Sequence, residues 1–234
     1  MKKTRKLINC DLGECLVLNP DGQIMPWIDQ ASIACGGHAG NDDSMAKTIK
    51  LAKQYQVSIG AHPSYPDKKH FGRRSIAMSL NQLFDSLVMQ VTTLNKHCRD
   101  QKVTMDYLKP HGALYHDIMH QAPIAEVICD VIKATKQELK LVVQAGVNTE
   151  QIMASAAKKN VQLQFEAFAD RVYQGVQLRL RTEEGAVLAT PEEIENQYYQ
   201  LSASNAFQID TICFHSDHPP SVKALQHLQV TTTC

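Results

Sequence analysis

Seven short apolar runs alternate along the chain with longer amphipathic stretches, and this alternation constrains the fold more than any other feature. Polar residues, glycine or proline bound the runs, which are Leu7–Cys10, Ala31–Cys35, Val57–Ala61, Met105–Leu108, Leu139–Val143, Val161–Phe165 and Ile209–Phe214. Short continuous apolar runs are typical of strands in a buried parallel sheet. The sequence therefore predicts parallel strands that are joined by helical crossovers.

The stretches between these runs carry apolar residues at helical spacing. The longest is Ser79–Cys98, where leucines and valines recur every three or four residues and Ser79 has capping-box spacing to Gln82. Thr190 followed by Pro191 is a second helix start. The remaining predicted helices are Asp42–Tyr55, Pro123–Lys136, Thr149–Lys159 and Pro220–Leu228.

Length and composition favour one globular domain over residues 1–234, with 44% hydrophobic and 21% charged residues. Lys plus Arg and Asp plus Glu are both 24, a balance that argues against nucleic acid as a partner. No apolar run reaches the roughly 18 residues of a membrane span. The N-terminus lacks the apolar stretch of a signal peptide, so we expect a cytoplasmic protein. Its scattered cysteines are then reduced: Cys10, Cys15, Cys35, Cys98, Cys129, Cys213 and Cys234.

Polar residues and glycine follow six of the seven apolar runs. These clusters are Asn9–Glu14, Cys35–Asp42, Gly60–Asp67, Lys109–Tyr115, Glu166–Arg171 and His215–Asp217. An open sheet concentrates its site at one switch point, whereas a barrel gathers the carboxyl ends of all its strands around one mouth. We therefore predict an α/β fold of one domain, a seven-stranded parallel β/α barrel.

The clusters would place imidazoles, carboxylates and two cationic side chains around one cleft. A single histidine at a strand end, or an Asp before Gly, is more often structural. Six clusters at equivalent ends instead favour a functional site. The candidate catalytic residues are Asp11, Glu14, His38, His62, Lys109, His111, Asp170, Arg171 and His215.

Other motifs narrow the chemistry. The chain has no P-loop, no dinucleotide-binding glycine motif and no Gly-x-Ser-x-Gly elbow. We interpret Cys35 as a buried strand-end thiol and Arg73 and Arg74 as loop-anchoring residues. Several candidates are metal-ligand types that could hold Zn²⁺ or Mn²⁺, namely Asp11, His38, His62, His111 and His215. None of these candidates is paired with another at His-x-x-x-His spacing, so a divalent metal is left open.

These motifs resemble the LamB/YcsF lactam-utilisation family, which includes the A subunit of the prokaryotic ATP-dependent 5-oxoprolinase. The matching stretches span the chain in family order: Asn9–Glu14, Ser32–Gly40, Gly60–Asp67, Phe71–Arg73, Leu108–Tyr115 and Glu166–Tyr173. Two stretches depart from the family pattern. His215-Ser216-Asp217 replaces His-Gly-Asp, and Arg181–Ala186 lacks a proline before its glycine.

The resemblance implies a barrel related to glycoside hydrolases and polysaccharide deacetylases. It also implies cleavage of 5-oxo-L-proline to L-glutamate, with ATP as a co-substrate and with 5-oxoprolinase subunits B and C as partners.

We accordingly expect Asp11 or Glu14 to act as the general base, because opening an activated lactam requires attack by water. His38 and His62 would position the water or protonate the ring nitrogen. Lys109 and Arg171 would bind phosphate or carboxylate. The residues that would orient these groups are His111, Asp170 and His215.

Two other functions fit the same residues. One is a stand-alone metal-dependent amidase or deacetylase. The other is a non-catalytic subunit that positions 5-oxoproline for its partners.

Overall fold

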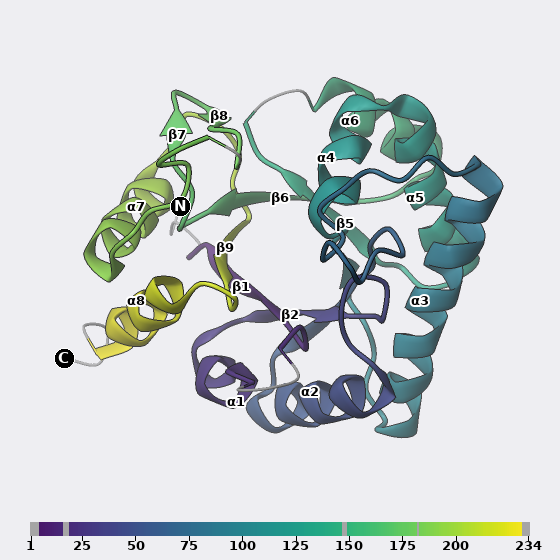
Figure 1. Cartoon of the computed structure of the whole chain (residues 1–234), viewed down its shortest axis with the longest axis horizontal. Coiled ribbons are helices and arrows are strands. Elements are labelled where there is room, and N and C mark those ends of the chain that lie inside the picture. Colours follow the sequence, from purple (N-terminus) through teal and green to yellow (C-terminus); the bar gives the residue numbers. More distant parts are fainter. Residues whose placement is uncertain (1–4, 16–18, 147–148, 182, 231–234) are drawn as a thin grey trace.

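Seven parallel strands close into a barrel that helices surround (Figure 1). The computed structural model describes residues 5–15, 19–146, 149–181 and 183–230, so Thr182 and Cys234 lie outside the described residues. In barrel order the strands are β1 (Leu7–Leu12), β2 (Gln30–Ala34), β3 (Ser58–His62), β4 (Tyr107–Leu108), β5 (Lys140–Gln144), β6 (Leu163–Phe168) and β9 (Thr211–His215). The predicted fold class and each predicted barrel strand are confirmed, with ends shifted by a few residues.

The strand register brings distant parts of the sequence together at one end of the barrel. β9 pairs with both β6 and β1, and this second pairing closes the ring. Asp11 is the register partner of His215 on β9 and of Ser32 on β2. His62 is likewise the partner of Ala34. Strand ends that carry polar residues therefore surround one mouth, as the sequence predicts.

The six predicted helices are all present. They are α2 (Asp42–Tyr55), α3 (Leu80–Asp100), α5 (Ala122–Ala134), α6 (Glu150–Lys158), α7 (Pro191–Ala203) and α8 (Pro219–Val230). The Ser79 side chain accepts a hydrogen bond from the Gln82 amide, and Gln82 closes the capping box. Thr190 caps α7 in the same way. These caps satisfy amides that have no partner within the helix.

Several short elements were not predicted. They are α1 (Asp21–Ile24), the 3₁₀ helix η1 (Met25–Trp27), α4 (Gly112–His120) and the hairpin β7 (Tyr173–Gln174) and β8 (Gln177–Leu178). α4 follows β4 directly, and its first residue, Gly112, has a φ of 57°. A Cβ there would lie 2.5 Å from the Gly72 carbonyl oxygen, so glycine permits this close approach.

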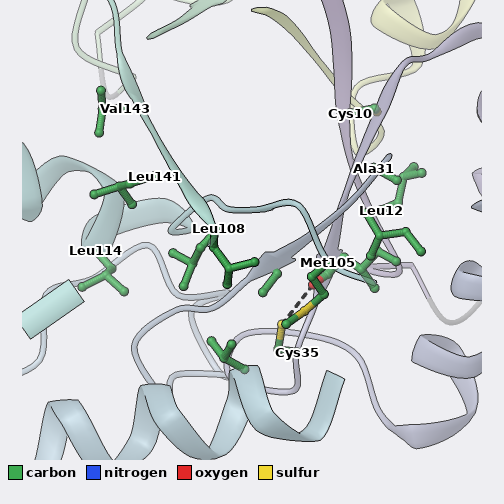
Figure 2. Packing of buried hydrophobic residues seen from close by; sticks show 14 of the residues in the cluster. Cys10, Leu12, Ala31, Cys35, Met105, Leu108, Leu114, Leu141 and Val143 are labelled. Carbon is green, nitrogen blue, oxygen red and sulfur yellow. Dashed lines mark hydrogen bonds between the residues drawn. The ribbon is translucent and has the colours of Figure 1, made fainter. Parts of the chain in front are cut away.

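Alternation along each strand separates an apolar shell from a polar barrel interior. Cys10, Leu12 and Leu108 belong to the hydrophobic cluster between barrel and helices, which Figure 2 shows in close-up. The alternate residues, such as Asn9 and Lys109, are buried and polar. Because successive side chains in a strand face opposite sides, each barrel strand contributes to both layers.

The interior side chains are paired with one another. At the amino-terminal end Gln30 and Gln164 exchange hydrogen bonds of 3.1 Å. Further along, Ser32 Oγ and the Tyr107 hydroxyl lie 3.1 Å apart. Such pairing removes the cost of burying these polar groups and leaves the carboxyl end for ionisable residues.

Cys35 is a buried structural thiol, as the sequence indicated. Its Sγ donates to the Ile33 carbonyl at 3.1 Å, and burial raises the pKa of the thiol to about 12. A group of such high pKa is a poor nucleophile at neutral pH. The six cysteines among the described residues are all free. None of the helices in this part of the chain is long and apolar enough to span a membrane.

Replacing Gly60 by alanine should destabilise the barrel by about 1–3 kcal/mol. A Cβ at this position would meet the Tyr107 ring at 2.1 Å, and that ring is fully buried. Denaturant unfolding measures the change. Gly22→Ala is the matched control, because nothing lies within 4 Å of its added Cβ. Equal stabilities of the two variants would contradict this account of the packing.

Candidate active site

Every candidate catalytic residue lies at the carboxyl end of the barrel strands. All except His38 and Asp170 line a cavity of about 850 Å³. His38 lies behind Glu14, and Asp170 lies behind His215. The cavity therefore presents a set of buried acids and bases, each of which is held by a second polar group.

Lys109 is the cation at the centre of this set. Its Nζ donates to Asp11 Oδ1 at 2.7 Å and lies 2.8 Å from Glu166 Oε1. Asn9 Oδ1 and Cys213 Sγ complete its surroundings, each at 3.2 Å. Burial opposes the charge on Lys109, but Asp11 and the other neighbouring anions outweigh it and raise the pKa of the ammonium well above its usual value. Lys109 is therefore a fixed positive charge.

His62 and Lys109 hold Asp11 in its ionised form. Burial would raise the pKa of its carboxyl group, but His62 and Lys109 together lower it well below its usual value. Oδ1 is used by Lys109, whereas Oδ2 lies 3.4 Å from His62 Nε2 and 4.0 Å from His215 Nε2. Asp11 thus presents one carboxylate oxygen to two imidazoles at the cavity wall.

His215 and Asp170 form a carboxylate–imidazole pair. His215 Nδ1 donates to Asp170 Oδ2 at 2.7 Å, which leaves Nε2 facing Asp11. Burial lowers the pKa of His215, but the Asp170 carboxylate outweighs burial and raises it above the ordinary value. The stacked Phe168 ring, with centroids 5.7 Å apart, fixes the plane of the imidazole. His215 is therefore oriented and more easily protonated than a free histidine.

The Glu14 carboxylate lies close to the other three candidate histidines. Its Oε1 lies 2.8 Å from His38 Nε2, 3.3 Å from His111 Nδ1 and 3.7 Å from His62 Nε2. Burial raises the pKa of the Glu14 carboxyl group. One ligand atom from each of these four residues falls within 4.8 Å of the others, so the cluster is a potential metal-binding group. Asp11, Cys213 and His215 form a second such group.

Arg171 anchors the segment that covers one side of the cavity. Its guanidinium donates to the carbonyls of Arg179, at 2.7 Å, and Ala186, at 3.3 Å. It is buried, whereas Arg73 and Arg181 line the cavity near its rim and are partly exposed. Both rim arginines pair with Asp217, so Arg73 has the anchoring contact expected from the sequence.

The serine that departs from the family pattern has a defined contact. Ser216 Oγ donates to the Asp11 carbonyl at 2.6 Å, which ties the loop after β9 to β1. The substitution thus adds a hydrogen bond between two segments that carry site residues.

Sequence reasoning placed Asn9, Tyr115, Glu166 and Asp217 in the strand-end clusters without naming them as candidates, and it missed Cys213. Asn9, Glu166 and Cys213 surround Lys109, Asp217 pairs with Arg73, and Tyr115 lines the cavity. The strand pattern gives a further signal for two of them. Asn9 precedes Asp11 by two positions, and Cys213 precedes His215 by two. Residues two apart on a strand share a face, so each points into the barrel with its site residue.

Asp170→Asn should lower the pKa of His215, because the amide no longer stabilises the imidazolium while burial still opposes it. Titration of the histidine ring resonances by NMR measures this change. Asp130→Asn is the control, since that carboxylate pairs with Lys159 at the surface. If the His215 titration were the same in the wild type and in Asp170→Asn, the ion pair would not govern its protonation.

The chain matches proteins of known family along almost its whole length. The model of the LamB/YcsF family matches residues 7–233. The 5-oxoprolinase A subunit of Vibrio cholerae serotype O1 is 39% identical over 243 residues, which cover 98% of this chain and 98% of that protein. A 5-oxoprolinase A subunit of Pseudomonas aeruginosa is 36% identical over an alignment that covers 96% of this chain and 95% of that protein.

The fold comparison agrees with the sequence comparison. A crystal structure of the lactam utilization protein from Thermus thermophilus superimposes with a TM-score of 0.86 at 27% identity, covering 98% of each chain. The barrel, the motifs at its mouth and the near-complete match of both chains lead to one conclusion. The chain belongs to the LamB/YcsF family.

Proposed function

We propose that this chain is the A subunit of an ATP-dependent 5-oxoprolinase, which hydrolyses 5-oxo-L-proline to L-glutamate in the cytoplasm together with subunits B and C. Relatives named as 5-oxoprolinase A subunits, 36% and 39% identical over nearly the whole chain, support this role. The observation that carries the proposal is the pair formed by Asp11, whose pKa is lowered, and His215, whose pKa is raised. Asp11 Oδ2 and His215 Nε2 lie 4.0 Å apart, and both residues line the cavity.

The reaction requires a base for the attacking water and an acid for the departing ring nitrogen. Hydrolysis forms a bond between a water oxygen and the lactam carbon and breaks the bond from that carbon to the ring nitrogen. Water must lose a proton, and the departing nitrogen must gain one. ATP would transfer its terminal phosphoryl group to the lactam oxygen and leave as ADP, which makes the carbon of this stable amide electrophilic and supplies the driving force. Ring opening by water then leaves an acyl phosphate, and a second water releases inorganic phosphate to give glutamate.

Asp11 and His215 fit these two tasks. The pKa of Asp11 is lowered, so it is ionised and accepts the proton of water, whereas the raised pKa of His215 favours the imidazolium that protonates the nitrogen. Neighbouring groups whose pKa values are driven apart are a mark of acid–base assignment. Of the two bases expected from the sequence, Asp11 is therefore the one we propose, and Asp170 orients the acid.

The cations divide between two tasks. Lys109 is already engaged by Asp11 and Glu166, so we assign it to fixing and ionising the base. We assign binding of the substrate carboxylate or a phosphate to Arg73 and Arg181, which share one carboxylate, Asp217, and unlike Lys109 are partly exposed in the cavity. Direct contact of Lys109 and Arg171 with ATP stays a prediction.

Asp11→Asn should reduce glutamate release by about 10²–10⁴-fold, because the amide cannot accept the proton of water. The assay supplies 5-oxoproline and ATP to the complex with subunits B and C. Circular dichroism and thermal unfolding confirm that the variant is folded. Asp43→Asn, which alters an exposed ion pair with Lys47, is the control and should retain full turnover.

Two results would reject parts of the proposal. A wild-type complex that releases no glutamate would refute the 5-oxoprolinase function. Full turnover by a folded Asp11→Asn complex would instead mean that this chain positions the substrate while its partners perform the chemistry.

A further inference from the structure

Two buried imidazoles face each other in an arrangement that neutral histidines disfavour. His62 Nε2 and His111 Nδ1 lie only 2.9 Å apart. The other nitrogen of each ring faces a backbone carbonyl: His62 Nδ1 is 2.7 Å from the Lys109 oxygen, and His111 Nε2 is 2.9 Å from that of Phe71. A carbonyl oxygen only accepts hydrogen bonds, so both outer nitrogens carry their protons.

The inner nitrogens of the neutral rings therefore direct lone pairs at one another. The other tautomer of either ring does not relieve this repulsion. It would move the proton to the inner nitrogen and leave the lone pair of the outer nitrogen facing a carbonyl oxygen. A cation between the two nitrogens removes the conflict. Both rings are buried, and burial of an extra charge requires a compensating anion nearby.

Glu14 supplies that anion at the distance that metal coordination requires. The three distances among Glu14 Oε1, His62 Nε2 and His111 Nδ1 are 2.9, 3.3 and 3.7 Å. Ligands about 2.0–2.1 Å from a tetrahedral Zn²⁺ lie about 3.3 Å from each other. We propose that His62, His111 and Glu14 bind a divalent transition metal ion, with Zn²⁺ as its best match.

His38 completes the site as a positioning residue. Its ring stacks on His111 with centroids 3.6 Å apart and planes at 4°, so the lone pairs of the two rings cannot converge in plane on one ion. His38 Nε2 instead donates to Glu14 Oε1 at 2.8 Å. Each of the three ligands then has an orienting partner, as protein metal ligands commonly do.

Three protein ligands leave one tetrahedral position, and all three residues line the large cavity. Zinc sites with three protein ligands and an open position are typical of catalytic rather than structural centres. The second potential group, Asp11 with Cys213 and His215, is less suited to a metal ion. The Lys109 ammonium already lies 2.7 Å from Asp11 and 3.2 Å from Cys213, so a second cation there would be repelled.

The test is titration of the full-length chain with Co²⁺ after dialysis against a chelator, followed by displacement with Zn²⁺. We expect one ion per chain and the visible bands of a nitrogen- and oxygen-ligated site. Glu14→Gln and His111→Gln should each weaken binding by at least about 100-fold. His38→Gln, which keeps an N–H donor, should weaken it by about 10-fold or less.

A double variant, His116→Gln with His120→Gln, controls for adventitious binding. These two residues lie one helical turn apart on α4 with ring centroids 4.2 Å apart, and their loss should leave the tight site intact. Circular dichroism of each variant shows whether it is folded. If one ligand variant does not fold, the other and the wild-type spectrum still decide the question.

Several results would overturn the inference. The absence of stoichiometric binding would mean that a shared proton joins the two imidazoles. A thiolate-to-cobalt charge-transfer band would place the ion at Cys213. Unchanged binding in folded Glu14→Gln and His111→Gln, or loss of binding in the double variant, would also exclude the site. The inference does not rest on the proposed 5-oxoprolinase activity, because every readout is binding.

Discussion

The ion pair between Lys109 and Asp11 inside the barrel is the interaction on which the rest of the site depends. Two carboxylates, an amide oxygen and a thiol surround one ammonium group in a space that water hardly reaches. Removing one member of a buried charge network commonly costs about 3–5 kcal/mol, because its partners keep their desolvation without compensation. The barrel must therefore keep these groups together, and the same contact, with His62, lowers the pKa of Asp11.

Barrel closure provides what the ion pair requires. Outward-facing side chains of the strands pack against helices, so the apolar shell carries the stability of the fold. The inward-facing side chains are then free to be polar, provided that each finds a partner across the barrel. This division explains how a chain of average composition places so many ionisable groups in one interior.

The sequence predicted the architecture because each barrel strand is a short apolar run with turn residues at its ends. It missed α4, since its nine residues begin at Gly112, inside a strand-end cluster, and give too few turns for a periodic signal. The hairpin of β7 and β8 has strands of two residues, below the length at which alternation is detectable. For the candidate site residues, the pattern of strand ends predicted that they lie around one cavity, but it did not predict how they pair. The residue types alone do not specify which carboxylates pair with Lys109 or which histidine donates to Asp170. These pairings depend on the register of the strands and on the directions of the side chains.

The position of Ser216 has a consequence for assembly of the site. Its bond to Asp11 joins residues 205 positions apart, across the junction where the first and last barrel strands meet. Asp11 and His215 are opposite each other at the same junction, so neither half of the chain contains the pair by itself. Contacts between such distant segments form only when long stretches of chain are already ordered. The proposed acid–base pair is therefore a property of the completed ring, and a chain whose ends have not met contains both residues without bringing them together.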